Sequence, residues 1–151
     1  MTRAKLSFVA VVFGLLLSLV LYGCDGGDDS DFPNVRGVYR GTITETDSGC
    51  RNPQANGTFT ANTTGNISSQ NGADFSGTVV NASGNTTSSI AGQVTAGGGV
   101  SGTLTFSASG VASQSTFSGT LTGNALTVNY SGRVTAGETC VFQGRFIGTR
   151  Q

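Results

Sequence analysis

Histidine and tryptophan are absent from this chain of 151 residues, and its only lysine is Lys5. Nucleophilic catalysis of the Ser–His–Asp or Cys–His kind needs an imidazole base, so both arrangements are excluded. Zinc sites draw on histidine, on several cysteines or on clustered carboxylates, and this chain has only three cysteines, which lie far apart. We therefore expect no enzyme, no bound metal and no other cofactor.

Charge is also scarce, because charged residues make up 11% of the chain and divide equally into eight basic and eight acidic side chains. A nucleic-acid-binding protein needs a dense basic face, so we expect no nucleic-acid partner. Beyond residue 32, no window shows apolar residues at helical spacing. Gly, Thr, Ser and Asn dominate this part instead, which favours strands joined by turns.

The N-terminal region has the features of an export signal. Arg3 and Lys5 precede an apolar run over residues 6–21, which is short for a permanent membrane span. The run ends in the tetrapeptide Leu21-Tyr22-Gly23-Cys24. This tetrapeptide resembles the lipobox of bacterial lipoproteins.

The resemblance implies cleavage after Gly23, lipidation of Cys24 and acylation of the new N-terminus with chains such as palmitate. Several acyl chains make the attachment stable, where one would be marginal. Residues 1–23 are then a signal peptide, and residues 24–32 are a lipidated N-terminus with a flexible acidic tether. The alternative is an ordinary cleaved signal peptide or a single-span anchor. The expected localisation is the cell envelope, on the inner or the outer bacterial membrane.

From residue 35 onward, apolar residues and glycines recur at every second position, which is typical of half-buried strands. Short turns such as Asn71-Gly72 separate most of the segments. Eight segments share this pattern, and their apolar faces are, in order, Tyr39, Gly41 and Ile43; Phe59, Ala61, Gly65 and Ile67; Phe75, Gly77 and Val79; Ile90, Gly92 and Val94; Val100, Gly102, Leu104 and Phe106; Phe117, Gly119 and Leu121; Leu126, Val128, Tyr130 and Val134; Cys140, Phe142, Gly144 and Phe146. The opposite faces carry Thr, Ser, Asn and Arg, which suits water rather than lipid.

We predict an all-β fold, a small antiparallel up-and-down β-barrel of about eight strands, formed by residues 33–151 as a single domain. Closure into a barrel leaves no free sheet edge, and glycines beside aromatic residues suit a narrow interior that alternates large and small. A β-sandwich requires the same alternation and is the second choice. A β-solenoid, suggested by Ser-Gly-Thr at Ser76, Ser101 and Ser118, is third because the spacings are unequal.

Two cysteines, Cys50 and Cys140, remain once Cys24 is lipidated, and an exported chain most often pairs such residues. Cys50 follows the first segment and Cys140 begins the eighth. In a closed meander these two segments are antiparallel neighbours, so we predict a Cys50–Cys140 disulfide. The alternative is two free thiols that serve redox chemistry or metal binding.

Two functional classes fit this interpretation. The first is a membrane-anchored lipoprotein that displays a packed barrel, with a structural role or an interaction with another envelope component. The second is a binding module for a small apolar ligand at the mouth or in the interior, since eight strands leave room for one small ligand. The aromatic residues that would line this site, or else form plain core, are Tyr39, Phe59, Phe75, Phe106, Phe117, Tyr130, Phe142 and Phe146.

Two groups of charged residues carry weaker predictions. If the first, seventh and eighth segments are adjacent, four arginines form an outward basic stripe for anionic lipid or polysaccharide, and scattered solubilising charge is the alternative. The four arginines are Arg36, Arg40, Arg133 and Arg145. Glu45, Asp47 and Glu138 lie near the mouth that holds the cysteines, either as an acidic rim or as ordinary exposed turn residues.

Overall fold

The computed structural model describes residues 31–108, 111–134 and 139–151. Each of the eight alternating segments forms a strand. In chain order the strands are β1 (Gly37–Ser48), β2 (Gly57–Asn71), β3 (Asp74–Asn81), β4 (Thr86–Val94), β5 (Gly99–Ala108), β6 (Val111–Thr122), β7 (Ala125–Val134) and β8 (Cys140–Arg150). A short 3₁₀ helix, η1 (Pro53–Ala55), lies between β1 and β2.

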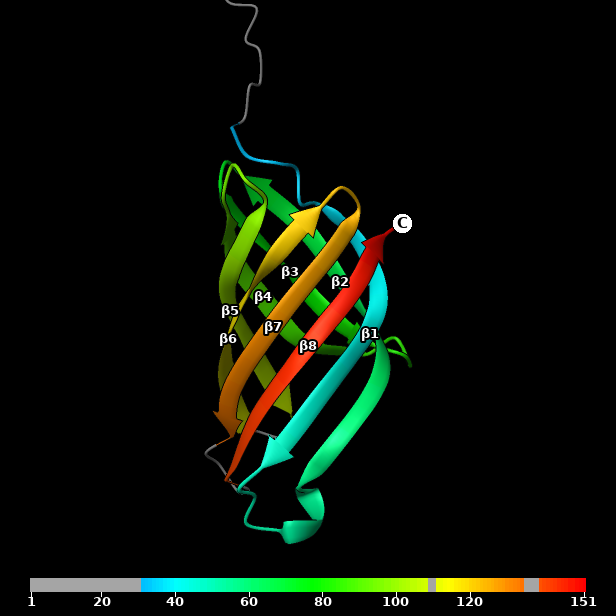
Figure 1. The fold of residues 1–151 in the computed structure, drawn as a ribbon, viewed down its shortest axis with the longest axis vertical. Helices are drawn as coiled ribbons and strands as arrows, with labels where there is room; N and C mark the ends of the chain where they lie inside the picture. Colours follow the sequence, from blue (N-terminus) through cyan, green and yellow to red (C-terminus); the bar gives the residue numbers. More distant parts are fainter. Residues whose placement is uncertain (1–30, 109–110, 135–138) are drawn as a thin grey trace, which may run out of the picture.

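The strands close into an antiparallel barrel. Each strand pairs with the next one along the chain, and β8 pairs with β1 in a register that runs from Tyr39↔Arg150 to Ser48↔Val141. Figure 1 shows the two strands side by side along the height of the barrel. The predicted up-and-down barrel is therefore confirmed, and the sandwich and solenoid alternatives are wrong.

The period-two alternation decides which side chains face the interior. In β8, Phe142 and Phe146 are buried, whereas Gln143 and Arg145 between them are exposed. Ile147 follows the same alternation and is 53% exposed, so it is an apolar residue on the otherwise mostly polar outer face. Apart from the cysteine, the buried apolar residues form one core inside the barrel: Val35, Tyr39, Ile67, Phe75, Val94, Val100, Phe117, Leu126, Tyr130, Phe142 and Phe146.

Glycines beneath aromatic rings give this narrow interior its shape. Phe117 pairs across strands with Gly102, and a Cβ added there would lie 2.8 Å from Cζ of Phe117 and 2.2 Å from the carbonyl oxygen of Ala91. Tyr130 pairs in the same way with Gly144, where an added Cβ would lie 2.3 Å from the ring. The alternation of large and small residues along each strand therefore places a glycine on one strand opposite an aromatic residue on the next.

The chain enters the barrel at the end that we call the upper mouth, where the C-terminus also lies (Figure 1). Phe32 and Val35 pack against the core at this mouth, and Val35 is only 1% exposed. The carbonyl oxygen of Val35 accepts a hydrogen bond from the Tyr39 hydroxyl at 2.9 Å. The Gln70 side chain accepts from the Val35 N–H at 2.8 Å and donates to the Pro33 carbonyl at 3.1 Å. These contacts close the upper mouth.

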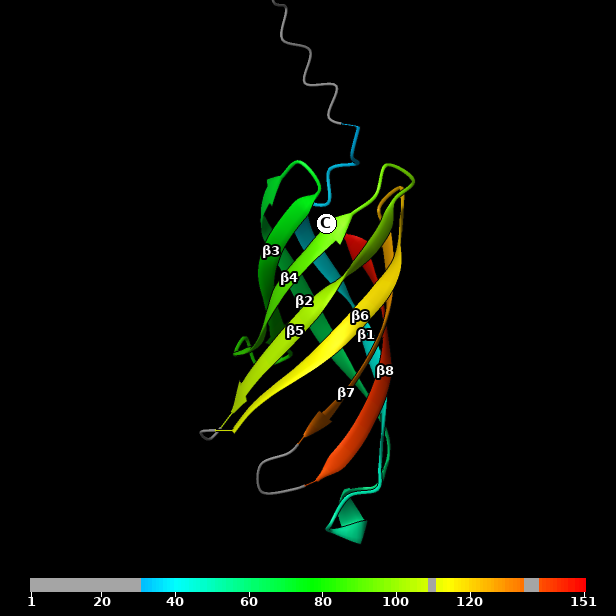
Figure 2. The ribbon, with the colours of Figure 1, turned by 90° about the vertical axis from the view of Figure 1, so that its left-hand side faces the viewer.

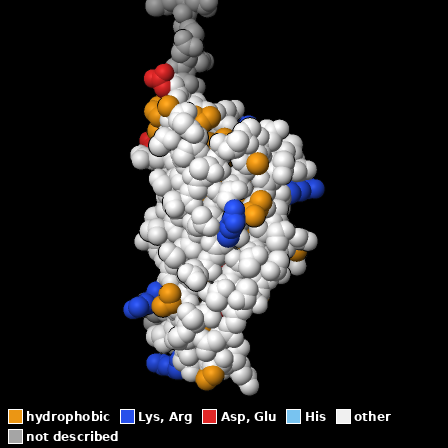
Figure 3. All heavy atoms as spheres, in the orientation of Figure 1, with side chains coloured by type: hydrophobic (Ala, Val, Ile, Leu, Met, Phe, Trp, Pro, Cys, Tyr) orange, Lys and Arg blue, Asp and Glu red, His pale blue; other side chains and the backbone are white. Residues whose placement is uncertain are grey.

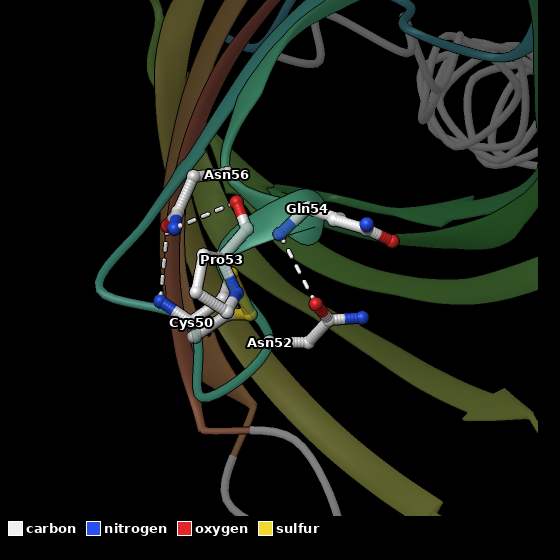
Figure 4. Close-up of a disulfide and its surroundings, with 6 residues drawn as sticks. Cys50, Asn52, Pro53, Gln54 and Asn56 are labelled. Carbon is white, nitrogen blue, oxygen red and sulfur yellow. Dashed lines mark hydrogen bonds between the residues drawn. A yellow bond between two sulfur atoms is a disulfide. The ribbon is translucent and has the colours of Figure 1, made fainter.

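The predicted Cys50–Cys140 disulfide is present at the opposite end, the lower mouth, with the Cα atoms 4.2 Å apart. It joins the end of β1 to the start of β8, where the barrel closes. Hydrogen bonds to two asparagine side chains stabilise the loop that carries Cys50 (Figure 4). Asn56 Oδ1 accepts from the Cys50 N–H at 3.0 Å, and the N–H of Gln54 donates to Asn52 Oδ1 at 3.1 Å.

The hairpins are of unequal length, which interrupts the wall of the barrel on one side. β3 pairs with β2 only from Thr63 upward, so residues 57–62 of β2 have no partner on β3. On the other side, the pairing of β4 with β5 ends at Phe106. Figures 1 and 2 show the β3–β4 turn ending well above the β1–β2 loop and the lower ends of β5 and β6. We call the gap below the β3–β4 turn the side opening.

The outer face over β7, β8 and β1 consists mostly of uncharged atoms, with basic side chains at separate points (Figure 3). This composition agrees with the Thr, Ser and Asn residues that alternate with the core positions in the sequence. In the part of the chain that the structure describes, no helix has the length and apolar character needed to cross a membrane.

Candidate functional site

A cavity of about 290 Å³ lies inside the barrel, and every strand contributes to its lining. Ile43, Val79 and Leu104 are among the apolar side chains that line it. The volume falls at the lower limit of small-molecule pockets, which start near 300 Å³. At roughly 30 Å³ per heavy atom, close to the share of a water molecule in the liquid, it holds about ten heavy atoms.

The cavity reaches solvent through the side opening. Phe59 and Ala61 of β2 line the cavity and are exposed, because no β3 residue covers this part of β2. Asn81 and Thr87, at the end of the β3–β4 hairpin, are exposed and also line it. An apolar interior with a polar upper rim therefore faces a gap in the wall.

The aromatic residues that the sequence predicted as a ligand lining all border this cavity except Phe142. Phe142 instead packs edge-on against Phe106, with ring centroids 5.7 Å apart, and lies 6.4 Å from the ring of Tyr130. Phe59 borders the cavity but is 44% exposed. Of the predicted residues, Phe142 therefore lies outside the cavity and Phe59 lies at the side opening. The others line the cavity.

Gly65 marks an open part of the cavity wall. It lies on the inner face of β2, and a Cβ added there would have no neighbour within 4 Å. Gly102, by contrast, has backbone atoms well inside contact distance of such a Cβ. Gly65 therefore faces free space and Gly102 faces a closely packed region. Substitutions at the two positions test this difference.

Ser88 contributes a polar atom to the lining that sequence analysis did not identify. The residue is 3% exposed, and its hydroxyl has no hydrogen-bond partner among the described residues. A buried hydroxyl left without a partner costs about 1–3 kcal/mol. Nothing in the sequence distinguishes this serine from the many others, because the lack of a partner depends on the packing around it.

Glu45 and Tyr130 form a polar contact inside the barrel, and both line the cavity. The Tyr130 hydroxyl donates to Glu45 Oε2 at 2.6 Å. Gly144 lies between them on β8, opposite Tyr130 on one side and Glu45 on the other. Because Gly144 has no side chain, the tyrosine ring can cross β8 and reach β1. The sequence placed Glu45 at a rim, and the structure places it half-buried on the inner face.

The surroundings of this contact shift three pKa values upward. Burial raises the pKa of Glu45, the hydrogen bond from Tyr130 opposes that rise, and the charge of Asp47 adds to it. Burial also raises the pKa of Asp47. For Tyr130, burial, then the hydrogen bond to Glu45, and then the two nearby carboxylates raise the pKa. The phenol therefore remains a proton donor at neutral pH.

Arg150, at the end of β8, belongs to the upper mouth rather than to the cavity. Its Nε and Nη2 atoms donate to the Tyr39 oxygen at 3.1 and 2.7 Å, and Nη2 also donates to the Asn34 carbonyl. The guanidinium carbon lies 5.4 Å from the centre of the Tyr39 ring. The sequence did not predict this contact, although Tyr39 and Arg150 lie opposite each other once β1 and β8 are paired.

The four arginines of the predicted basic stripe are all exposed, over β7, β8 and the region from residue 36 into β1. Arg40 lies opposite Thr149 and Arg133 lies opposite Val141, each four residues from Arg145 along β8. At about 3.3 Å per residue, successive charges are about 13 Å apart. The stripe is therefore a line of separated charges, and its binding of anionic polymers stays a prediction.

Several predicted features fall outside the described residues. These are the signal peptide over residues 1–23, Cys24 with the proposed lipid, most of the acidic tether, and Glu138, the third member of the predicted acidic rim. Within the ranges that are described, no group of three or more His, Cys, Asp or Glu residues lies close enough together to hold a metal ion.

Comparisons with known proteins bear on the fold alone. Neither the models of known protein families nor the curated proteins yield a match to this sequence. Among solved structures, the chain is similar to the isotype 1 transferrin binding protein B from serogroup B Neisseria meningitidis, with a TM-score of 0.51 and 14% sequence identity. The match covers 83% of this chain but only 27% of that protein, so it concerns one part of a much longer molecule.

Proposed function

We propose that this protein is a lipid-anchored lipoprotein of the bacterial cell envelope whose barrel binds a small apolar molecule. The observation that carries the proposal is the apolar cavity of about 290 Å³, which opens to solvent through the side opening. A barrel whose only role was display would gain stability by filling this space, because empty apolar volume loses packing contacts. The unpartnered Ser88 hydroxyl adds a polar group that a ligand can bind.

The position of the proposed anchor supports ligand access. The chain reaches the barrel at the upper mouth, where Phe32 and Val35 pack against the core. The side opening and the lower mouth lie away from this end (Figures 1 and 2). A lipid on Cys24, joined to the barrel by a short acidic tether, therefore leaves the side opening free of the attachment point.

Native mass spectrometry of the protein purified from the cells that produce it tests this function. We expect a co-purifying small molecule in the wild-type protein at a ratio of one to one. The Gly65→Leu variant, whose new side chain projects into the open part of the cavity, should lack it. The matched control is Gly97→Leu, because Gly97 also has free space around it but lies in an exposed turn. Equal ligand content in Gly65→Leu and Gly97→Leu contradicts the proposal.

A second candidate function is recognition of another envelope protein. It is favoured by the unpaired stretch of β2, residues 57–62, since an extended segment of a partner can add to a free strand edge. The name of the similar solved structure states that it is a transferrin binding protein. Proline at Thr60, an exposed residue of this stretch, should abolish such pairing without entering the cavity. Unchanged binding of a partner by Thr60→Pro contradicts this mode of recognition.

A further inference from the structure

Two carboxylates face the lower half of the interior from β1. Glu45 lies opposite Gly144, and Asp47 lies opposite Phe142, which is a buried inner-face residue. Glu45 borders the cavity and accepts a hydrogen bond from Tyr130 at 2.6 Å, and Asp47 follows it toward the lower mouth. The apolar cavity is therefore bordered on its β1 side by Glu45, and Asp47 lies beyond it toward the lower mouth.

No cationic side chain compensates these acids in the part of the chain that the structure describes. Residues 31–151 contain no lysine and no histidine, so arginine is the only possible partner. Arg150 binds Tyr39 at the upper mouth, Arg51 is exposed in the loop after β1, and the remaining arginines form the exposed basic stripe. Burial raises the pKa values of Glu45 and Asp47, which reflects the cost of holding negative charge there.

A second observation at the same cavity points to a missing occupant. The Ser88 hydroxyl, on β4, is 3% exposed and makes no hydrogen bond with any described residue. An unpaired hydroxyl and an uncompensated carboxylate in one cavity are both unfavourable in the empty protein. A ligand with an apolar body and a hydrogen-bonding cation removes the cost of the uncompensated carboxylate.

We propose that the ligand of this barrel is an amphiphilic cation, whose apolar chain fills the cavity and whose ammonium group binds Glu45 with Asp47 beside it. This inference rests on the proposed ligand-binding function and specifies its chemistry. An ammonium group has three donors and one positive charge, so it can bind the Glu45 carboxylate while Tyr130 keeps its own hydrogen bond. A fatty acid would place a third negative charge beside two carboxylates that already lack a cationic partner.

Calorimetric titration with three probes of one chain length tests the inference. The protein is the exported chain with Cys24→Ser, which cannot take lipid, and the probes are decylammonium, decan-1-ol and decanoate at pH 7. We expect decylammonium to bind at least tenfold more tightly than decan-1-ol, and decanoate to bind most weakly. Tenfold corresponds to about 1.4 kcal/mol, which is modest for a partly buried charged hydrogen bond.

The variant Glu45→Gln should lose the preference for decylammonium but bind decan-1-ol within twofold of the parent protein, which also shows that the cavity is intact. Asp74→Asn is the matched control, because Asp74 is an exposed carboxylate that binds Gln93 outside the cavity. Equal affinity for the three probes, or an unchanged preference for decylammonium in Glu45→Gln, overturns the inference. In either case, binding of decan-1-ol still supports the proposed ligand-binding function. Failure of all three probes to bind overturns both.

Discussion

Replacing Gly65 with leucine should stabilise this protein, whereas most substitutions of a buried glycine in a narrow barrel destabilise it. A side chain at Gly65 enters the cavity, where a Cβ meets no atom within 4 Å. Burying a leucine side chain contributes about 1.5–3 kcal/mol, and removing a strand glycine contributes about 0.5–1 kcal/mol. Loss of leucine rotamers costs about 0.5–1 kcal/mol. Because the site is partly open to solvent, we expect a net gain of about 1–2 kcal/mol.

Gly102→Ala should have the opposite effect although it adds a smaller side chain. Its Cβ would lie 2.2 Å from the Ala91 carbonyl oxygen and 2.8 Å from Phe117 Cζ, so the strands have to move apart. Overpacking of this kind typically costs about 1–3 kcal/mol.

Urea unfolding followed by circular dichroism measures both variants against the wild-type protein and the Gly97→Leu control. For a domain of this size each kcal/mol shifts Tm by roughly 4 °C, so thermal unfolding gives an independent reading. If Gly65→Leu loses stability to the extent that Gly102→Ala does, the interior at Gly65 is filled and the cavity is wrong.

Three further predictions concern the two mouths and the buried acid. Reducing the Cys50–Cys140 bond, which spans 90 residues, should lower the free energy of unfolding by up to about 4–5 kcal/mol; a change below about 1 kcal/mol in the urea midpoint contradicts this. Tyr39→Phe should cost about 1–3 kcal/mol, because the Arg150 guanidinium loses its acceptor; an unchanged Tm contradicts it. The raised pKa of Glu45 means that the folded state holds its proton above pH 4.5, so stability should fall as pH rises from 4.5 through the folded-state pKa. Glu45→Gln should flatten this part of the profile of Tm against pH. Parallel profiles for the variant and the wild-type protein would contradict the raised pKa of Glu45.

The sequence predicted most of the fold because strand alternation has a fixed period. The phase of Tyr39, Gly41 and Ile43 assigns the inner face of β1, and the same reasoning assigns the other strands. Closure was predicted because a barrel leaves no free sheet edge, and the positions of Cys50 and Cys140 agreed with it. The local pattern was sufficient here because each strand pairs only with the strands before and after it in the chain, and β8 pairs with β1.

The features that make a binding site were not predictable in this way. Alternation gives the phase of a strand but not its register or length, so the short β3–β4 hairpin and the side opening could not be seen. Glu45 is in phase with Ile43, and that signal was present, yet its position near a turn favoured an exposed rim. The Tyr130–Glu45 contact crosses a third strand through Gly144, and the Ser88 hydroxyl lacks a partner only because of the packing around it.

Fluorescence titration with the small neutral dye 1-naphthylamine, whose size is close to that of the cavity, tests most directly whether the barrel interior is a ligand site. The chain has no tryptophan, so the dye signal is read with little background from the protein. We predict one saturable site with blue-shifted emission in the wild-type protein and in Gly97→Leu, and loss of that site in Gly65→Leu. A wild-type protein that leaves the dye emission unchanged, or a Gly65→Leu variant that binds it equally well, would contradict a binding cavity in this barrel.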